Sequence, residues 1–129
     1  MEAHLVNRIN ELWQPIYPHL AAWILRLGPA RPCRILEIGP FSGGISYEVI
    51  TRSPHAKGVC AEADKHIIHT IDALFGSKLK FVIADPKRLP CGARFNLVIS
   101  RGAFFFLTPE RLKESHRVLQ PGGCALLGG

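Results

Sequence analysis

From Arg34 onward the chain alternates short apolar runs with segments of helical period, and this alternation constrains the fold more than any other feature. Short apolar runs bounded by polar residues or glycine are typical of strands buried within a sheet. The expected strands are 34–38, 58–62, 79–84, 95–100 and 124–127, and the expected helices between them are 43–52, 65–75 and 109–119. Only the connection 85–94 is too short and proline-rich for a full helix. Alternation of this kind predicts right-handed βαβ units and an α/β fold around a mostly parallel sheet.

The first thirty residues differ from the rest because they predict helices only. Residues 5–13 place apolar side chains on one side of a helix, Pro15 and Pro18 interrupt it, and 19–27 resumes as an apolar helix that ends at Gly28-Pro29. We therefore divide the chain into a helical segment, 1–30, which we expect to serve as a pocket lid or a dimer contact, and an α/β body, 31–129.

Polar residues and glycines gather where the expected strands end. Glu37 and Gly39 follow the first strand, Glu62 closes the second, Asp85 follows the third, and Ser100 closes the fourth. Ligands of parallel sheets bind outside the carboxyl ends of the strands, at the point where the strand order reverses. The sequence therefore predicts a binding site at this edge.

The turn after the first strand has the pattern E-x-G-x-x-x-G, because Phe41 stands where a dinucleotide fingerprint has its middle glycine. An acid two residues before the first glycine is a poor neighbour for a pyrophosphate and suits an ammonium or sulfonium group. Gly39 permits a tight turn, and Gly43-Gly44 lets the next helix begin close to a ligand carboxylate. A plain strand–turn–helix remains the alternative.

The second strand end supplies an acid at a suggestive spacing. Glu62 follows Glu37 by 25 residues, close to the ~20 residues after which an acid reaches the ribose hydroxyls in such folds. A solvated strand terminus is the alternative for Glu62. Asp64 stands where an N-cap of the helix 65–75 is expected, which favours a structural role.

The stretches EIGPFSGG, CAEAD, ADPKRLP, FNLVISRGAFFF and RVLQPGG together resemble class I S-adenosylmethionine-dependent methyltransferases of the small-molecule type, over roughly residues 33–127. The resemblance implies a Rossmann-like three-layer fold, with about five strands in the order 3-2-1-4-5, and S-adenosyl-L-methionine as the cofactor. It also implies a cofactor site. In that site Glu37, Gly39, Pro40, Phe41 and Gly43 surround the methionine part, Glu62 and Ala63 hold the ribose, Asp85 and Pro86 meet the adenine, and Ser100 and Arg101 line the methyl-donor end. Tyr17 or Trp13 of the helical segment would close the pocket, although aromatic residues on a short helix are as typical of a core.

Two positions depart from the family pattern. Phe41 replaces the middle glycine, although some relatives with small-molecule acceptors also have a bulky residue there. Pro86 stands where relatives commonly offer a backbone N–H to the adenine ring, and proline has none. We therefore expect one cofactor hydrogen bond to be missing, at a cost of about 1 kcal/mol.

The family fold normally continues past the fifth strand with a helix and an antiparallel hairpin, which this sequence lacks. A bare edge at the fifth strand predicts a homodimer that covers it. A compact member that holds its substrate with the N-terminal helices and Phe104–Phe106, or a fragment, are the alternatives. The three phenylalanines are equally compatible with ordinary core.

The totals exclude several classes of function. No apolar run approaches the ~20 residues of a membrane span, and we expect a cytoplasmic protein with no membrane partner. The net charge of +6 comes from singly scattered Lys and Arg, which predicts a solvated basic surface and disfavours nucleic acid as a partner. Binding of RNA or of an anionic substrate is the less favoured alternative. The four cysteines read as small, buried, reduced residues, and a zinc site at Cys60, His66 and His69 lacks a fourth ligand.

The activity expected from these residues is transfer of a methyl group from the cofactor to O, N or C of a small molecule. The alternatives are a non-catalytic cofactor-binding regulator or partner subunit and, less favoured by Phe41 and Glu37, a nucleotide-binding oxidoreductase. No catalytic base can be assigned; His4, His19 and His116 are available, but lone histidines are usually structural.

Overall fold

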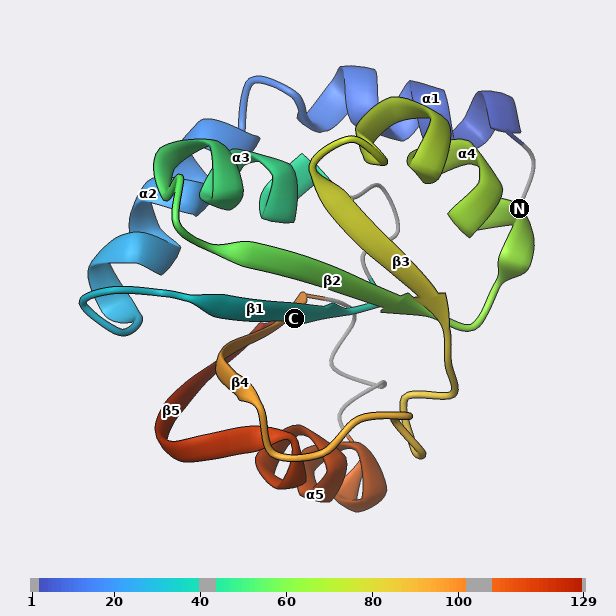
Figure 1. Ribbon diagram of the computed structural model, residues 1–129. Coiled ribbons are helices and arrows are strands. Elements are labelled where there is room, and N and C mark those ends of the chain that lie inside the picture. The colour runs from blue at the N-terminus through green and yellow to red at the C-terminus, as the bar shows by residue number, and fades with distance from the viewer. Residues whose placement is uncertain (1–2, 40–43, 102–107, 129) are drawn as a thin grey trace.

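A five-stranded parallel sheet forms the centre of the molecule (Figure 1), which we describe from a computed structural model of residues 3–39, 44–101 and 108–128. The strands lie in the order β3-β2-β1-β4-β5, and all neighbours run parallel. The order predicted from the sequence is therefore confirmed. The strands are β1 (Arg34–Ile38), β2 (Lys57–Glu62), β3 (Leu79–Ile83), β4 (Phe95–Arg101) and β5 (Leu119–Gly128).

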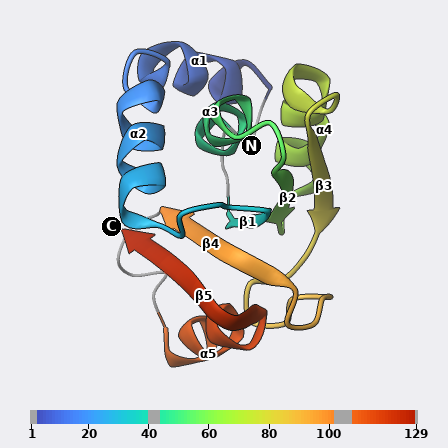
Figure 2. The ribbon, with the colours of Figure 1, turned by 60° about the vertical axis from the view of Figure 1, so that its left-hand side comes forward.

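Helices cover the two faces of the sheet unequally (Figures 1 and 2). On one face lie α1 (Ala3–Trp13), α2 (Tyr17–Leu27), α3 (Gly44–Arg52) and α4 (Lys65–Phe75), and on the other lies α5 (Pro109–Arg117). The result is the expected three-layer arrangement. No helix in the described part of the chain is long and apolar enough to cross a membrane.

The hydrophobic core is divided by the sheet because successive strand residues point to opposite faces. Ile35 packs with α2 and α3, whereas Leu36 packs with Val118 at the end of α5. Tyr17, Ala21 and Ile24 of α2 are buried in the first of these clusters, so the N-terminal helices share the core of the α/β body. A role for them as lid or dimer contact remains a prediction.

The connection between β3 and β4 contains no helix and is held by α5 instead. Arg117 donates to the carbonyl oxygens of Leu89 (2.8 Å) and Cys91 (2.7 Å), and Glu114 accepts from the Leu89 N–H at 2.7 Å. Glu114 also receives two hydrogen bonds of 2.7 Å from Arg117. The bonds from Arg117 first, and then that from Leu89, lower the pKa of Glu114 to about 2.

β5 begins five residues earlier than the sequence predicts, and α5 ends at Arg117 rather than Leu119. Leu119 pairs with Phe95 and Cys124 pairs with Leu97, so a longer stretch of β5 lies opposite two steps of β4. Gly122 adopts a positive φ of 80° within that stretch. The Pro-Gly-Gly turn therefore interrupts the pairing locally, and pairing exists on both sides of it.

The cysteines only partly match their expectation. All four are free thiols, but only Cys60 is buried; Cys33 is exposed, and Cys91 and Cys124 are intermediate. The expectation of four buried cysteines is therefore wrong, because Cys33 precedes β1 on the surface.

Candidate functional site

The carboxyl ends of β1, β2 and β4 bring three predicted site residues to one edge of the sheet. The Gly39 N–H donates to the carbonyl of Ala61 at 2.8 Å, which continues the β1–β2 ladder up to Glu62. On the other side of β1, the Ser100 hydroxyl donates to the carbonyl of Ile38 at 3.4 Å. Gly39, Glu62 and Ser100 therefore lie on three adjacent strands, with β1 in the middle.

Gly39 forms an open turn at the end of β1. Its φ is +63°, a left-handed conformation that glycine adopts without the strain a side chain would add. A Cβ atom placed on Gly39 would have no described atom within 4 Å. The end of β1 therefore offers backbone to a ligand at close range.

The start of α3 is fixed by contact with α2. A Cβ atom on Gly44 would lie 2.1 Å from Cε2 of Tyr17, whose ring is only 4% exposed. No side chain fits at Gly44 while that ring is in place. Tyr17 thus supports the helix that begins at the site, and the N–H groups of a helix's first turn attract carboxylates.

Glu37 lies beneath the turn rather than on its surface. Glu37 is 1% exposed, and its carboxylate accepts a 2.5 Å hydrogen bond from the hydroxyl of Ser46 on α3. Cys60 on β2 is the register partner of Glu37. Burial raises the pKa of the Cys60 thiol well above its ordinary value, and the charge of Glu37 raises it further, whereas a hydrogen bond with Ser46 lowers it. Glu37 therefore links β1 to α3, and contact with a cofactor remains a prediction.

Glu62 and Asp64 have separate roles after β2. Asp64 caps α4 by accepting from the N–H groups of His66 (2.8 Å) and Ile67 (3.4 Å), which confirms its predicted structural role. The half-buried Glu62 accepts from the Asp64 N–H through Oε2 at 3.0 Å. Within the described residues no bond to Oε1 is seen, so this oxygen is available to ligand hydroxyls. Ala63, between them, is exposed.

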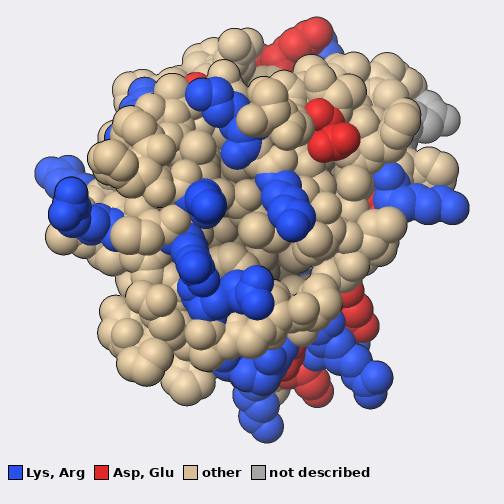
Figure 3. Space-filling model, viewed as in Figure 1, with Lys and Arg blue, Asp and Glu red and all other residues tan. Residues whose placement is uncertain are grey.

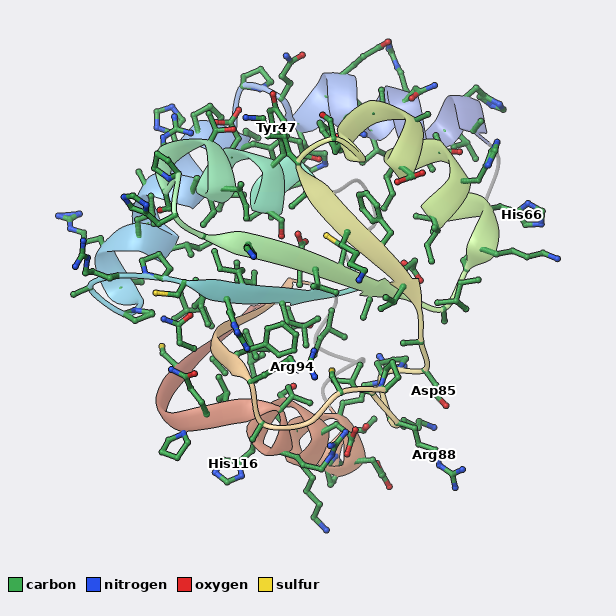
Figure 4. All side chains as sticks on the ribbon, viewed as in Figure 1. Tyr47, His66, Asp85, Arg88, Arg94 and His116 are labelled. Atoms are coloured by element: carbon green, nitrogen blue, oxygen red, sulfur yellow. The ribbon has the colours of Figure 1, made fainter. Side chains whose placement is uncertain are left out.

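Asp85 and Pro86 lie beyond the end of β3. The exposed Asp85 carboxylate accepts from the Lys87 N–H at 2.9 Å, and the Arg88 N–H donates to the Asp85 carbonyl at 2.8 Å. Figure 4 shows Asp85 and Arg88 pointing outward from this turn. One carboxylate oxygen of Asp85 thus stabilises its own turn. The contact of Asp85 with adenine remains a prediction.

Several expectations fall outside the described residues: Pro40, Phe41 and Gly43, the side chain of Arg101, and Phe104–Phe106. Arg101 itself ends β4 and pairs with Gly128. Across residues 3–39, 44–101 and 108–128, no group of three or more His, Cys, Asp or Glu side chains could hold a metal ion. His116 points away from the sheet below α5, and His66 lies on the outside of α4 (Figure 4).

Gly44 was expected at the start of the helix beside the ligand, whereas Ser46 was not anticipated as part of the site. A serine one turn into the helix after a glycine-rich loop could have been assigned as the partner of Glu37, because a buried carboxylate requires a donor. The packing of Tyr17 on Gly44 has no local signal, since the two residues come from different elements.

A family model described as a methyltransferase domain matches residues 35–123, from β1 into β5. The chain belongs to this methyltransferase family. The match covers the glycine-rich turn, the carboxyl ends of β1 to β4, and Glu114 and Arg117 of α5, which hold the β3–β4 connection. The edge described above is therefore the edge of a methyltransferase domain.

Solved structures share this fold. A protein from Methanococcus maripaludis assigned as an S-adenosyl-L-methionine-dependent methyltransferase is 23% identical, with a TM-score of 0.84 over 99% of this chain and 64% of its own. A Haloferax volcanii methyltransferase in complex with the Trm112 activator is 20% identical, with a TM-score of 0.79 over 96% and 56%. TrmN from Thermus thermophilus is 27% identical, with a TM-score of 0.72 over 85% and 37%. No curated protein sequence matches the chain.

The chain thus spans less than two thirds of the length of each of these three structures. The fold is widely shared, with 531 solved chains matching, so likeness of fold does not select an acceptor. The residues present nevertheless fit S-adenosylmethionine: an open glycine turn, a helix N-terminus and a carboxylate with one available oxygen lie at one edge.

Proposed function

We propose that this chain binds S-adenosyl-L-methionine at the carboxyl ends of β1, β2 and β4 and transfers its methyl group to O, N or C of a small-molecule acceptor. The observation that supports this best is the combination of Gly39 and Glu62 at that edge. Gly39 has a positive φ and no described atom within 4 Å of its Cβ position, and Glu62 has one carboxylate oxygen without a described partner. Membership of the methyltransferase family supports the same reaction.

Each residue has a role that follows from its place. The turn at Gly39 and the first N–H groups of α3 receive the methionine carboxylate, since helix N-termini favour anions. The buried charge of Glu37 lies beneath that turn and favours the adjacent ammonium group electrostatically. Oε1 of Glu62 accepts from the ribose hydroxyls. Asp85 retains Oδ2 for an adenine amino group while Oδ1 holds its own turn.

The cofactor supplies an electrophilic methyl group on a sulfonium. The chain contributes proximity and orientation, which are sufficient for an in-line displacement when the acceptor is a good nucleophile. Ser100, near the end of β4, would line the methyl-donor end and help to orient an acceptor there. We assign no catalytic base.

A second candidate is a cofactor-binding partner subunit that does not turn over. Pro86 supports it, because the adenine site lacks one backbone N–H. A similar domain forms a complex with a methyltransferase activator, which supports a methyltransferase fold working with a second protein. A homodimer that covers the outer edge of β5, seen at one side of the sheet in Figure 2, remains our proposal for the quaternary structure.

Calorimetric titration with S-adenosylmethionine, S-adenosylhomocysteine and NAD tests these proposals. We expect both sulfur ligands to bind and NAD not to bind. Failure of both sulfur ligands would contradict both candidates. Binding without methyl transfer to a broad panel of O, N and C acceptors would favour the partner subunit.

A further inference from the structure

Four basic side chains form a row across the sheet, far from the proposed cofactor edge. Lys80 lies on β3, Lys57 begins β2, Arg34 begins β1, and Arg94 immediately precedes β4. All four are exposed. They come from segments distant in sequence, yet they follow the spatial strand order β3-β2-β1-β4. We call these four residues the basic row.

The strand register places the members of the basic row on a diagonal across the sheet. Arg34 is the direct register partner of Lys57, and Lys80 pairs with Val59, two residues further along β2. The Arg34 N–H donates to Oδ1 of Asn96 at 3.0 Å, which fixes the start of β4 beside the start of β1. The β1–β4 register puts Asn96 opposite Arg34, so Arg94 is offset by two residues toward the amino ends of the strands, and Lys80 is offset by two residues toward their carboxyl ends. With strands about 4.8 Å apart and about 3.3 Å per residue, the row runs diagonally over about 20 Å.

Three members of the row project from one face. Leu36, Val59 and Val82 all pack into the cluster on the α5 side, and each follows Arg34, Lys57 or Lys80 by two residues. Because side chains alternate along a strand, Arg34, Lys57 and Lys80 point to the same side. At their end of the strands this face has no described helix over it.

The charge of the row is not neutralised by its surroundings. Figure 3 shows more Lys and Arg than Asp and Glu over the middle of this view, and the Asp and Glu that it shows lie above and below that region. Among the described residues, ion pairs involve Arg8, Arg52 and Arg117, and none of the four members.

We propose that the basic row binds a polynucleotide strand through its phosphates. A diagonal array of four cations over about 20 Å matches the phosphates of about six nucleotides at a rise of about 3.4 Å each. Neither a globular protein partner nor a membrane fits as well, because each is usually anchored by apolar side chains. The exposed large apolar residues lie elsewhere; they are Leu5, Leu12, Ile16, Trp23, Leu27, Leu74, Ile83 and Leu112.

The row lies at the amino ends of the strands, whereas the proposed cofactor site lies at their carboxyl ends. Binding of a polynucleotide therefore does not depend on the cofactor or on methyl transfer. A protein that does not bind the cofactor could still bind a polynucleotide at the basic row. Failure to bind a polynucleotide would likewise leave the proposed cofactor site untouched.

The test is fluorescence anisotropy with a labelled single-stranded RNA of 16 nucleotides or so and the DNA of the same sequence. The triple variant Lys57→Gln, Lys80→Gln, Arg94→Gln removes three charges from the row. The matched control Arg26→Gln, Lys65→Gln, Lys113→Gln removes three exposed charges from α2, α4 and α5. Circular dichroism and thermal melting of both variants show whether the fold is retained.

Wild type and control should bind the RNA, the DNA or both. Their affinity should fall about 50-fold between 50 and 200 mM salt, as four single-strand phosphate contacts predict. The row variant should bind the polynucleotide at least about tenfold more weakly than the wild type at 50 mM salt. Its affinity should fall only about threefold between 50 and 200 mM salt, because one phosphate contact remains. Equal losses in both folded variants would overturn the proposal. So would binding of poly-glutamate or anionic phosphatidylserine vesicles as tightly as either polynucleotide.

Discussion

The contact between Tyr17 and Gly44 makes a sharp prediction about stability. In Gly44→Ala the new Cβ would lie 2.1, 2.4 and 2.7 Å from Cε2, Cδ2 and Cζ of Tyr17. Carbon atoms normally approach to about 3.5 Å, so the buried ring or the start of α3 must move by more than about 1 Å. Overpacking of this kind costs about 1–3 kcal/mol, offset by up to about 1 kcal/mol from the helix preference of alanine. We expect a net loss of about 1–2 kcal/mol in the free energy of unfolding.

Urea unfolding followed by circular dichroism measures this loss, and two other glycines serve as controls. Gly92→Ala meets no described atom within 4 Å and should be neutral or slightly stabilising. Gly39→Ala meets none either, but its φ of +63° should cost about 1–2 kcal/mol through backbone strain alone.

A double-mutant cycle separates the clash from other effects. Tyr17→Leu removes the Cε2 and Cζ atoms, so Gly44→Ala should cost at least about 1 kcal/mol less in that background. The cost of Gly39→Ala should not change. If Gly44→Ala destabilises no more than Gly92→Ala, or if the cycle shows no coupling, then Tyr17 does not fix the start of α3 and our reasoning is wrong.

Three further predictions concern individual carboxylates and their partners. Glu62→Gln should weaken S-adenosylmethionine binding about tenfold or more in calorimetry, because a charged acceptor is lost, and its free energy of unfolding should stay unchanged. The control variant Glu110→Gln should bind S-adenosylmethionine as tightly as the wild type. Ser46→Ala should lower the unfolding free energy by about 1–3 kcal/mol, because it removes a donor from the buried Glu37; a loss similar to that of an exposed serine would argue against the link. The lowered pKa of Glu114, about 2 against the ordinary 4.5, adds stability that is complete above about pH 4.5 and disappears as the pH falls towards 2. The stability difference between wild type and Glu114→Gln should shrink over that window, and a constant difference would contradict the assignment.

The sequence predicted the strands and helices well because their signals are local. β1 and α4 have the predicted bounds, since an apolar run before a glycine defines the strand and Asp64 defines the start of the helix. The beginning of β5 was not predictable in the same way. Pro121-Gly122-Gly123 reads as a break, and only the partner strand β4 shows that Leu119 is already paired.

The candidate site was predictable as an edge but not as a set of contacts. Residues at the strand ends could be listed because parallel strands end together. The burial of Glu37 under Ser46 could not, because it depends on how α3 packs on β1. The turn that occupies Asp85 likewise requires the position of the Lys87 N–H.

The basic row is the feature that was hardest to predict from the sequence. Lys57, Lys80 and Arg94 stand singly among other residue types, which argues against a nucleic-acid patch when charge is read along the chain. Crossover connections bring these three residues together with Arg34, on or just before four adjacent strands, and only the sheet topology reveals the array.

The strand order also has a consequence for folding during synthesis. β1 lies between β2 and β4, and its contact with β4 joins residues 62 positions apart, as in the bond from Arg34 to Asn96. Ribosomes add about 5–20 residues per second. One edge of β1 therefore waits about 3–12 seconds for its partner, with unpaired backbone groups at the centre of the future sheet. In this interval the unpaired edge of β1 can pair with another chain, and slowing translation over residues 39–94 should increase the dependence of folding on chaperones.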